Sequence, residues 1–298
     1  MSKLQQRIDN NEFIITCELT PPKGTDLTAL FAKADMLKHH ITAFNLTESH
    51  AARMAMDPAA VAHLLLDRGI EPIVQMTSRD KNRIAIQACM LGAAALGIPN
   101  LVFMGGDPPK AGDHPDAKPV FDLFASQLLD AVKAIQSGTD YMGNALSGTP
   151  KFCVGAVVNP GSPNLDTEIE NMYRKIESGA CFLQTQAVYD TEQFHSFMEK
   201  IGDVGVPILA GVIPIKSVKM ARYMNEKVPG ITVPDALISQ VAEQGDDRER
   251  IAATSVEISG RIVSELRSIA GGLHLMAIGW EDRIPQILES GGVSRQPG

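Results

Sequence analysis

The sequence predicts a single-domain α/β protein whose strands close into an eight-stranded (β/α)8 barrel. The chain has 298 residues, a length that one such barrel can use in full. A short β-branched run, a loop and then an amphipathic helix recur along the chain, mostly every 25 to 30 residues or so, the size of one strand-plus-helix unit. Neither GxGxxG nor GxxxxGK[ST] occurs, which disfavours an open doubly wound sheet with a nucleotide-binding loop.

Eight strands are expected in this order along the chain. They begin near Phe13, Ile41, Glu71, Pro99, Lys151, Cys181, Val206 and Gly272. The runs 101–104 and 206–210 are almost continuously apolar, as parallel strands are when helices cover both faces of the sheet. Strands that alternate with helices in this way form a parallel sheet.

Helix signals lie between the strands. Asp57 is a typical N-cap with Pro58 at the first helical position, and Asp166 and Glu168 place acidic residues in the first turn of another helix. Two intervals are longer than the others. Residues 105–150 are expected to hold a long loop, a helix near 121–136 and a Gly-rich connection, and residues 214–271 to hold two or three helices. No domain boundary is evident, so one domain is expected over 1–298, with a frayed tail at 290–298.

Composition limits the possible functions. The chain has 27 basic and 35 acidic residues and a net charge of −8, which argues against nucleic-acid binding but leaves room for an acidic small molecule. The four cysteines form no CxxC motif and the seven histidines no HExxH motif, so no metal site is expected. The chain lacks an apolar leader and a run long enough to span a membrane, so we expect a cytoplasmic protein with reduced thiols.

In a (β/α)8 barrel, the chemistry takes place at the carboxyl ends of the strands. Glu18 interrupts the first apolar strand just before Pro21 and Pro22. A carboxylate at this position would be partly desolvated, which raises its pKa and suits it to general acid catalysis. A structural ion pair with a nearby Lys or Arg explains the same residue equally well.

Two further polar residues follow strands. Asp107 comes after Gly105 and Gly106, which let a ligand approach the backbone closely, although an Asx-turn at this bend is an equal alternative. Gln186 ends the sixth strand and could bind the edge of a heterocycle or simply bond to backbone. Carboxylates and amides without a metal describe a site that binds a polar heterocycle and moves a proton.

The order and spacing of these motifs resemble the methylenetetrahydrofolate reductase family over roughly residues 12–292. The motifs are Glu18-Leu19-Thr20-Pro21-Pro22, Gly106-Asp107, Thr185-Gln186, Tyr189-Asp190 and Gly211-Val212-Ile213-Pro214. The resemblance implies a bacterial-type catalytic barrel that contains FAD and no regulatory domain. It also implies reduction of 5,10-methylenetetrahydrofolate to 5-methyltetrahydrofolate in one-carbon metabolism and methionine biosynthesis, with NADH or NADPH as electron donor. We further expect a homo-oligomer.

The resemblance also assigns roles to single residues. Glu18 would be the catalytic acid, Asp107 would hold the pterin and tune the flavin, and Gln186 would contact the folate. The substrate side would also include Met220 and Trp280. The flavin side would include Thr47, Gln75, Gly105, Gly106, Asp107, Asn159, Glu168 and Lys175. By its place on a helix alone, Lys175 would be a solvated surface lysine.

The chain departs from the family pattern in several places. Gln75 and Gly105 stand where relatives have His and Arg, and Asn159 lies in a segment that replaces a Tyr-containing one. Met220 replaces a folate-binding Gln, and Trp280 replaces the Arg that anchors the folate tail. Trp280 could stack on a ligand or merely cap the barrel end. Two alternatives therefore stay open: a pterin-binding one-carbon transferase without flavin, and a catalytically silent folate-binding partner subunit.

Overall fold

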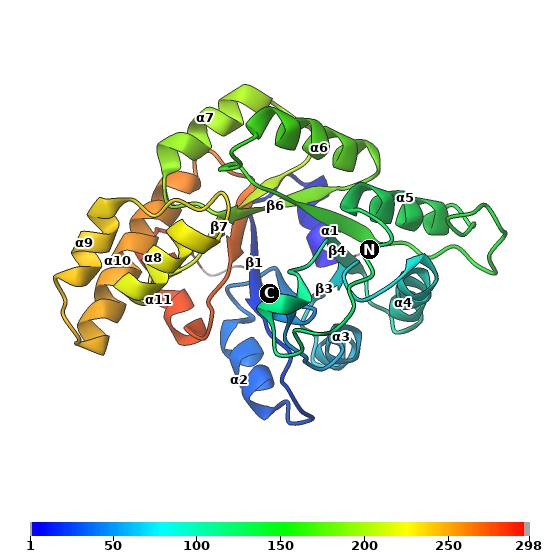
Figure 1. Ribbon diagram of the computed structural model, residues 1–298, viewed down its shortest axis with the longest axis horizontal. Helices are drawn as coiled ribbons and strands as arrows, with labels where there is room; N and C mark the ends of the chain where they lie inside the picture. Colours follow the sequence, from blue (N-terminus) through cyan, green and yellow to red (C-terminus); the bar gives the residue numbers. More distant parts are fainter. Residues whose placement is uncertain (1, 295–298) are drawn as a thin grey trace.

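The computed structural model describes residues 2–294, and in it eight parallel strands close into a barrel in sequence order (Figure 1). The strands are β1 (Ile14–Leu19), β2 (Ala43–Leu46), β3 (Pro72–Thr77), β4 (Asn100–Met104), β5 (Cys153–Val158), β6 (Phe182–Ala187), β7 (Ile208–Val212) and β8 (Gly272–Leu275). β1 pairs with β8 in parallel, starting at Ile14 and Gly272, which closes the ring. The predicted (β/α)8 fold is confirmed, and each strand begins within two residues of its expected start.

Helices surround the barrel and cover the outer faces of its strands (Figure 1). They are α1 (Lys3–Asp9), α2 (Thr28–Leu37), α3 (Pro58–Leu66), α4 (Arg83–Ala95), α5 (Ala125–Gln136), α6 (Leu165–Glu177), α7 (Thr191–Ile201), α8 (Val218–Lys227), α9 (Asp235–Ala242), α10 (Arg248–Leu266) and α11 (Ile284–Ser290). Three short 3₁₀ turns, η1 (His50–Ala52), η2 (Pro109–Ala111) and η3 (Glu281–Arg283), lie in loops.

The helix signals are confirmed. The side chain of Asp57 accepts a hydrogen bond from the backbone N–H of Ala59 at the start of α3, and α6 begins with acidic residues in its first turn. The interval 214–271 holds three helices, α8 to α10. The helix expected near 121–136 starts only at Ala125, because Phe121 has a left-handed backbone (φ 44°) that cannot continue into a helix.

The end of the barrel where the strands begin, called the lower end below, is closed by α1. The sequence did not indicate this helix. Leu4 is fully buried in a layer formed by the first inward side chains of the strands, and Glu71 accepts hydrogen bonds from the backbone N–H groups of Lys3 and Leu4 at 2.6 and 2.8 Å. This leaves the opposite end, where the strands finish, as the open mouth.

At the other end of the chain, α11 finishes at Ser290 and the backbone N–H of Val293 donates to Leu288 at 2.8 Å. The rest of the tail that we expected to fray, residues 295–298, lies outside the described residues. Within residues 2–294, no helix is both long enough and apolar enough to cross a membrane.

Candidate active site at the barrel mouth

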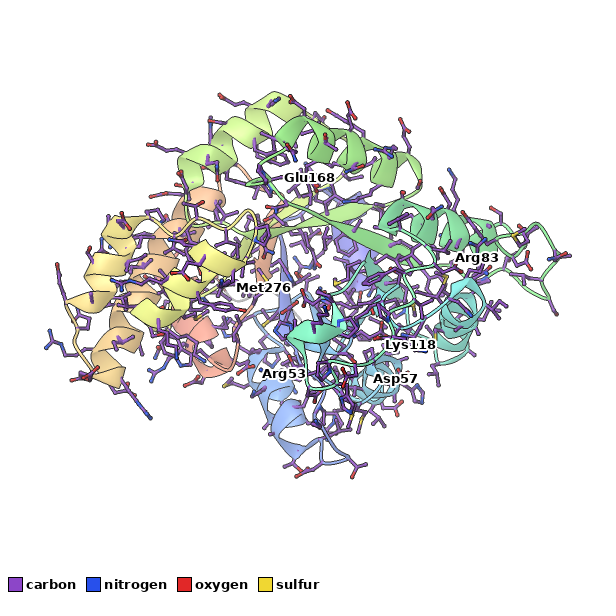
Figure 2. All side chains as sticks on the ribbon, in the orientation of Figure 1. Arg53, Asp57, Arg83, Lys118, Glu168 and Met276 are labelled. Atoms are coloured by element: carbon purple, nitrogen blue, oxygen red, sulfur yellow. The ribbon has the colours of Figure 1, made fainter. Side chains whose placement is uncertain are left out.

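A cavity of about 420 Å³ opens at the carboxyl ends of the strands, a size that suits a small-molecule ligand. Glu168 and Met276 lie at two sides of this opening (Figure 2). The predicted site residues that line the cavity are Glu18, Gln75, Asn159, Glu168, Lys175 and Gln186. The other predicted residues, Thr47, Gly105, Gly106, Asp107, Met220 and Trp280, lie outside its lining.

Glu18 faces the cavity from the end of β1. Its Oε1 accepts a hydrogen bond from Gln75 Nε2 at 3.0 Å and lies 3.6 Å from His274 Nε2. Burial, the largest influence, would raise the pKa of Glu18, but hydrogen bonding and charge from His274, helped by His50 and Gln75, outweigh it and lower the pKa. The expectation of a raised pKa is therefore wrong, because the sequence could not show that an imidazole from β8 stands beside the carboxylate.

Below Glu18, polar side chains cross the inside of the barrel. His274 Nδ1 lies 3.0 Å from Thr16 Oγ1, which also accepts from Gln184 Nε2 at 3.2 Å. Gln184 Oε1 in turn accepts from Asn45 Nδ2 at 2.8 Å. The sequence analysis missed His274, although a single polar residue inside the apolar run 272–275 could have marked it.

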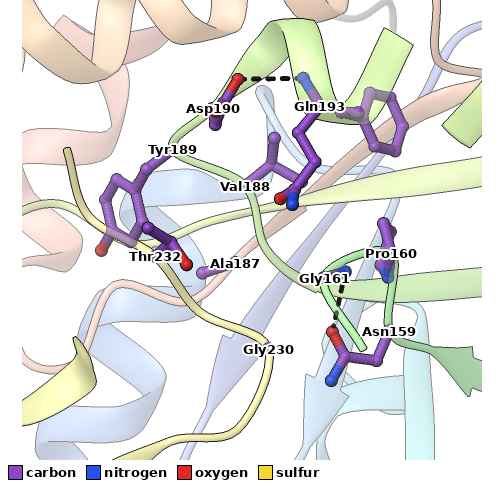
Figure 3. A pocket seen from close by; sticks show the side chains of 11 residues that line it. Asn159, Pro160, Gly161, Ala187, Val188, Tyr189, Asp190, Gln193, Gly230 and Thr232 are labelled. Atoms are coloured by element: carbon purple, nitrogen blue, oxygen red, sulfur yellow. Dashed lines mark hydrogen bonds between the residues drawn. The ribbon is translucent and has the colours of Figure 1, made fainter. Parts of the chain in front are cut away.

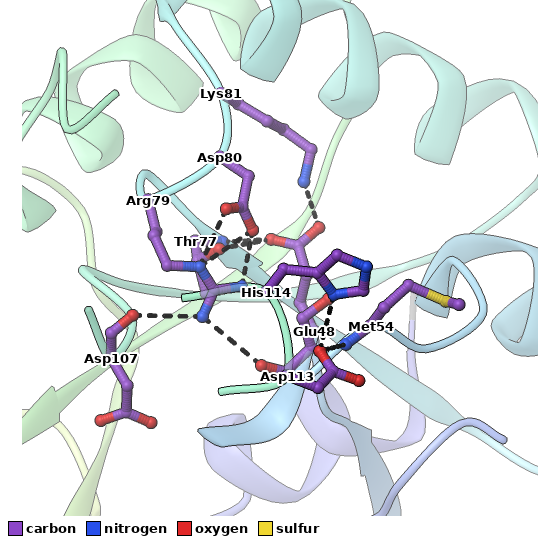
Figure 4. Close-up of polar contacts among 10 residues, drawn as sticks. Glu48, Met54, Thr77, Arg79, Asp80, Lys81, Asp107, Asp113 and His114 are labelled. Atoms are coloured by element: carbon purple, nitrogen blue, oxygen red, sulfur yellow. Dashed lines mark hydrogen bonds and ion pairs between the residues drawn. The ribbon is translucent and has the colours of Figure 1, made fainter. Parts of the chain in front are cut away.

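Asp107 lies at the rim of the mouth and is exposed. Its backbone carbonyl accepts a hydrogen bond from Arg79 Nη1 at 3.3 Å, while its carboxylate points away from that cluster (Figure 4). Among residues 2–294 the carboxylate has no hydrogen bond, so the Asx-turn alternative lacks its defining contact. Gly106 has φ 88°, and a Cβ there would lie 3.2 Å from Thr77 Cβ, so glycine allows the close approach of the β3 and β4 ends.

A second polar cluster, also missed by the sequence analysis, ties together the loops after β2, β3 and β4 (Figure 4). Arg79 is buried, pairs with Asp80 at 2.5 Å and donates to the carbonyl of Ser49 at 3.4 Å. Glu48 Oε2 accepts from the backbone and the hydroxyl of Thr77, at 2.6 and 2.8 Å, and the Glu48 carboxylate also pairs with Lys81. These contacts fix the position of the loop that carries Asp107.

Lys175 is buried beside the cavity rather than solvated, so the surface interpretation is wrong. Its Nζ donates to the carbonyl of Val157 at 2.7 Å and lies 3.7 Å from Glu168 Oε1. Burial, foremost, lowers the pKa of Lys175, and Glu168 opposes that shift. Lys175 lies on the face of α6 that packs toward the end of β5. Its ammonium group and the Glu168 carboxylate together form a charged side of the cavity.

Asn159 belongs to the lining, but its side chain has a structural task. Its Oδ1 accepts from the backbone N–H of Gly161 at 3.2 Å, and its Nδ2 donates to the carbonyl of Pro229 at 3.1 Å. These contacts form part of a small pocket beside the mouth (Figure 3). Its volume of about 10 Å³ holds roughly one water molecule, so it is no substrate site.

The remaining predicted residues differ in their surroundings. Thr47 is buried at the end of β2, and its Oγ1 has no hydrogen-bond partner among the described residues. Gln186 Oε1 accepts from the backbone N–H of Ala187 at 3.1 Å, as its structural alternative proposed. Trp280 is half-buried, and Lys216 Nζ lies 5.4 Å from the centre of its ring. Met220 packs partly buried on α8.

Over residues 3–292 the chain matches the family model described as "Methylenetetrahydrofolate reductase". Methylenetetrahydrofolate reductase 1 of Schizosaccharomyces pombe is 25% identical over 93% of this chain and 45% of its own length. The probable methylenetetrahydrofolate reductase (NADPH) of Caenorhabditis elegans is 22% identical over 99% of this chain and 45% of its own. The chain therefore spans about half the length of the curated relatives it matches.

Solved structures share the barrel. A protein from Clostridium thermocellum that binds two copies of 5-methyl-5,6,7,8-tetrahydrofolic acid has a TM-score of 0.63 at 18% identity, covering 96% of this chain and 97% of that one. EDTA monooxygenase (EmoA) from Chelativorans sp. BNC1 has a TM-score of 0.56 at 13% identity, covering 96% and 99%. At these identities the similarity concerns the fold.

Proposed function

The chain belongs to the methylenetetrahydrofolate reductase family, and on that premise we propose that its barrel reduces 5,10-methylenetetrahydrofolate to 5-methyltetrahydrofolate in one-carbon metabolism. One observation carries the proposal: the half-buried carboxylate of Glu18 faces a cavity of ligand size and is held by Gln75 and His274. The C. thermocellum protein, which shares the fold, binds the product of this reaction.

Glu18 is proposed as the acid. Opening the imidazolidine ring of the substrate requires a proton on the ring nitrogen that departs from the bridging methylene carbon, and Glu18, at the end of β1, is an acidic side chain in the cavity lining. Gln186, two residues after Gln184 on β6, would bind the edge of the folate ring. Asp107, whose carboxylate makes no hydrogen bond within residues 2–294, would hold the pterin from the rim. Met220 and Trp280 would complete the substrate side.

The proposed cofactor is FAD, and the residues present fit it. Thr47 Oγ1 is a buried polar atom at the end of β2 with no hydrogen-bond partner within residues 2–294, and Gly106 leaves an open backbone where a side chain would crowd β3. Lys175 and Glu168 would meet the phosphate and ribose. Gln75, Gly105, Asp107 and Asn159 would complete the flavin side, Asn159 through its backbone because its side chain is engaged. Bound reduced flavin would supply the hydride, while the protein orients the substrate and provides the proton.

NADH or NADPH is proposed as the electron donor, since named relatives use one or the other. By the family resemblance, Met224 on α8 occupies the position of an aromatic ring that covers the nicotinamide in relatives, but here it is buried in the core, and its Sδ accepts from the hydroxyl of Tyr189 at 3.6 Å. It therefore offers no surface to a nicotinamide. Met220 and Trp280 are the apolar groups left on that side, which favours weak nicotinamide binding.

The test is an anaerobic titration of FAD-reconstituted protein with NADH and NADPH in parallel, followed by addition of methylenetetrahydrofolate. We expect one nucleotide to bleach the visible flavin absorbance and the folate to restore it, with formation of methyltetrahydrofolate. A protein that binds folate and transfers its one-carbon unit without taking up FAD would be the transferase alternative. A protein that binds folate but forms no methyl product even with an artificial electron donor would be the silent partner subunit.

A further inference from the structure

The environment of Glu18 contains a histidine to which the family resemblance gave no role. Thr16 of β1 lies directly opposite His274 of β8 in the strand register, and Glu18 is two residues further along β1 on the same inward face. The imidazole thus lies between a hydroxyl below and a carboxylate above. On its other side β7 places Gly211 opposite His274, so no charged side chain faces the ring from that strand.

The hydrogen bonds of Thr16 determine which nitrogen of His274 carries a proton. The Thr16 hydroxyl donates to the carbonyl of Leu273 at 3.3 Å, and its oxygen accepts from Gln184 Nε2 at 3.2 Å. A hydroxyl has one hydrogen and two acceptor positions. With its hydrogen directed to Leu273, the Thr16 oxygen has an acceptor position left for an N–H of His274 Nδ1, 3.0 Å away. The ring therefore carries a proton on Nδ1 and turns Nε2 toward Glu18.

Nε2 of His274 and Oε1 of Glu18 lie 3.6 Å apart, with side chains only 4% and 17% exposed. If the ring were neutral with its proton on Nδ1, the Nε2 lone pair would face a carboxylate in a poorly solvated place, which is unfavourable. One additional proton between the two groups removes this repulsion. Gln75 Nε2 also donates to Oε1, and His50, from the loop after β2, is a further titratable group whose charge acts on Glu18.

We propose that His274 is a positioning residue that shares one proton with Glu18 and supplies it when Glu18 protonates the substrate. This rests on the proposed function. The His274 Nε2–H bond breaks as an O–H bond forms on Glu18, and that O–H bond then breaks as an N–H bond forms on the departing ring nitrogen. The electron pair of the C–N bond stays on the ring nitrogen, and the neutral imidazole regains its proton from solvent before the next turnover.

The first test measures the protonation of the two His274 ring nitrogens and does not depend on turnover. Nitrogen-15 NMR of histidine-labelled protein should give His274 a protonated Nδ1 at all pH values, and an Nε2 that keeps its proton to higher pH in the wild type than in Glu18→Gln. An Nε2 resonance that titrates identically in the two proteins would overturn the proposal, whether or not the protein reduces folate.

The second test separates a proton-holding role from a structural one. His274→Asn keeps a side-chain amide near Thr16 but cannot hold the proton, so the folate half-reaction should slow by roughly 10² or more while flavin reduction stays unchanged. In His274→Ala, added imidazole should restore the folate half-reaction, because the adjoining cavity of about 420 Å³ admits it. His63→Asn, on α3 outside the site, is the matched control and should change neither step.

The possible outcomes are distinct. A folate half-reaction that is unaffected in His274→Asn, or one that imidazole does not restore in a folded His274→Ala, would overturn the role of His274 and leave the reductase proposal intact. Absence of folate reduction in the wild type would reject the proposed function, while the NMR titration would still decide whether the two groups share a proton.

Discussion

At the residue scale, the chemistry of the mouth depends on the charge of Glu18. The carboxylate is half-buried, yet its pKa is lowered, because His274 and Gln75 stabilise its charge against the effect of burial. Such a group gives up a proton easily but must first receive one. The groups that contact Glu18 therefore affect its ability to act as an acid as much as the carboxyl group does.

Glu18→Gln should leave flavin reduction by NADH or NADPH nearly unchanged and slow the folate half-reaction by roughly 10² or more, the usual contribution of a general acid. The amide keeps the size of the side chain and its contact with Gln75 but has no acidic proton. Stopped-flow absorbance resolves the two half-reactions. Equal losses in both would show that Glu18 is structural.

The lowered pKa of Glu18 also predicts how stability depends on pH. A carboxyl group whose pKa is lower in the folded than in the unfolded chain contributes stability above the unfolded value, about 4.3 for Glu, and loses it as the pH falls through the folded value. The difference in the free energy of unfolding between wild type and Glu18→Gln should therefore shrink below about pH 4. Urea titrations at pH 7 and at acid pH measure it, and a constant difference would contradict the assigned charge.

Asp107→Asn should weaken folate turnover and change the rate of flavin reduction, since a carboxylate near the isoalloxazine disfavours its anionic reduced form. The carboxylate has no hydrogen bond within residues 2–294, so the substitution should leave the melting temperature unchanged. Steady-state kinetics and thermal unfolding test both statements. Normal kinetics in both half-reactions would leave Asp107 as a loop residue only.

At the scale of elements, the buried Arg79 holds the loops after β2, β3 and β4 in one arrangement through Asp80 and two backbone carbonyls. These loops carry Asp107 and the strained backbone of Ser49, Ala51 and Ala52, whose φ values are 46°, 53° and 56°. Non-glycine residues hold this conformation only where surrounding contacts impose it. The cluster around Arg79 is thus a support for the rim of the site.

Arg79→Met should lower the free energy of unfolding by roughly 1–3 kcal/mol, because it removes several hydrogen bonds from a buried cation. It should also weaken folate binding, since the loops after β2 and β4 lose the hydrogen bonds that Arg79 donates to their carbonyl groups. Arg83→Met is the control: its ion pair with Asp122 is partly exposed to solvent and should contribute less to stability than the contacts of the buried Arg79. Urea unfolding compares the two, and equal losses would show that burial of Arg79 adds nothing.

At the scale of the whole molecule, the two ends of the barrel have separate tasks. The lower end is apolar and closed by α1, whereas the upper end holds the polar network, the cavity and the loops. This division is general for (β/α)8 barrels, in which the lower face mainly supports stability. Changes at the lower end should therefore affect folding but not chemistry.

Leu4→Ala tests this division. Leu4 is fully buried in the lower layer, so its truncation should cost roughly 2–5 kcal/mol of unfolding free energy. Gln6→Ala, at an exposed position of the same helix, should cost little. Both variants should keep the wild-type rate of the folate half-reaction in the folded protein. A slowed half-reaction in folded Leu4→Ala would show that the two ends are coupled.

The sequence by itself determined the fold and most of the strand boundaries, because burial of alternating strands and helices imposes periodic patterns that are local in the chain. It also identified Glu18, Asp107 and Gln186 as residues at strand ends. It could not give the sign of the pKa shift of Glu18, which depends on His274, 256 positions away in the chain.

The tertiary structure decided which side chains contact one another in the site. Closure of the ring puts β8 beside β1 and so brings His274 to Thr16 and Glu18, a contact that only strand register specifies. Packing of α6 against the barrel likewise buries Lys175, which local polarity had suggested was solvated. Charges and hydrogen bonds act over a few ångströms in space and not along the chain, so the protonation of the site follows from the closed barrel and not from any segment of the sequence.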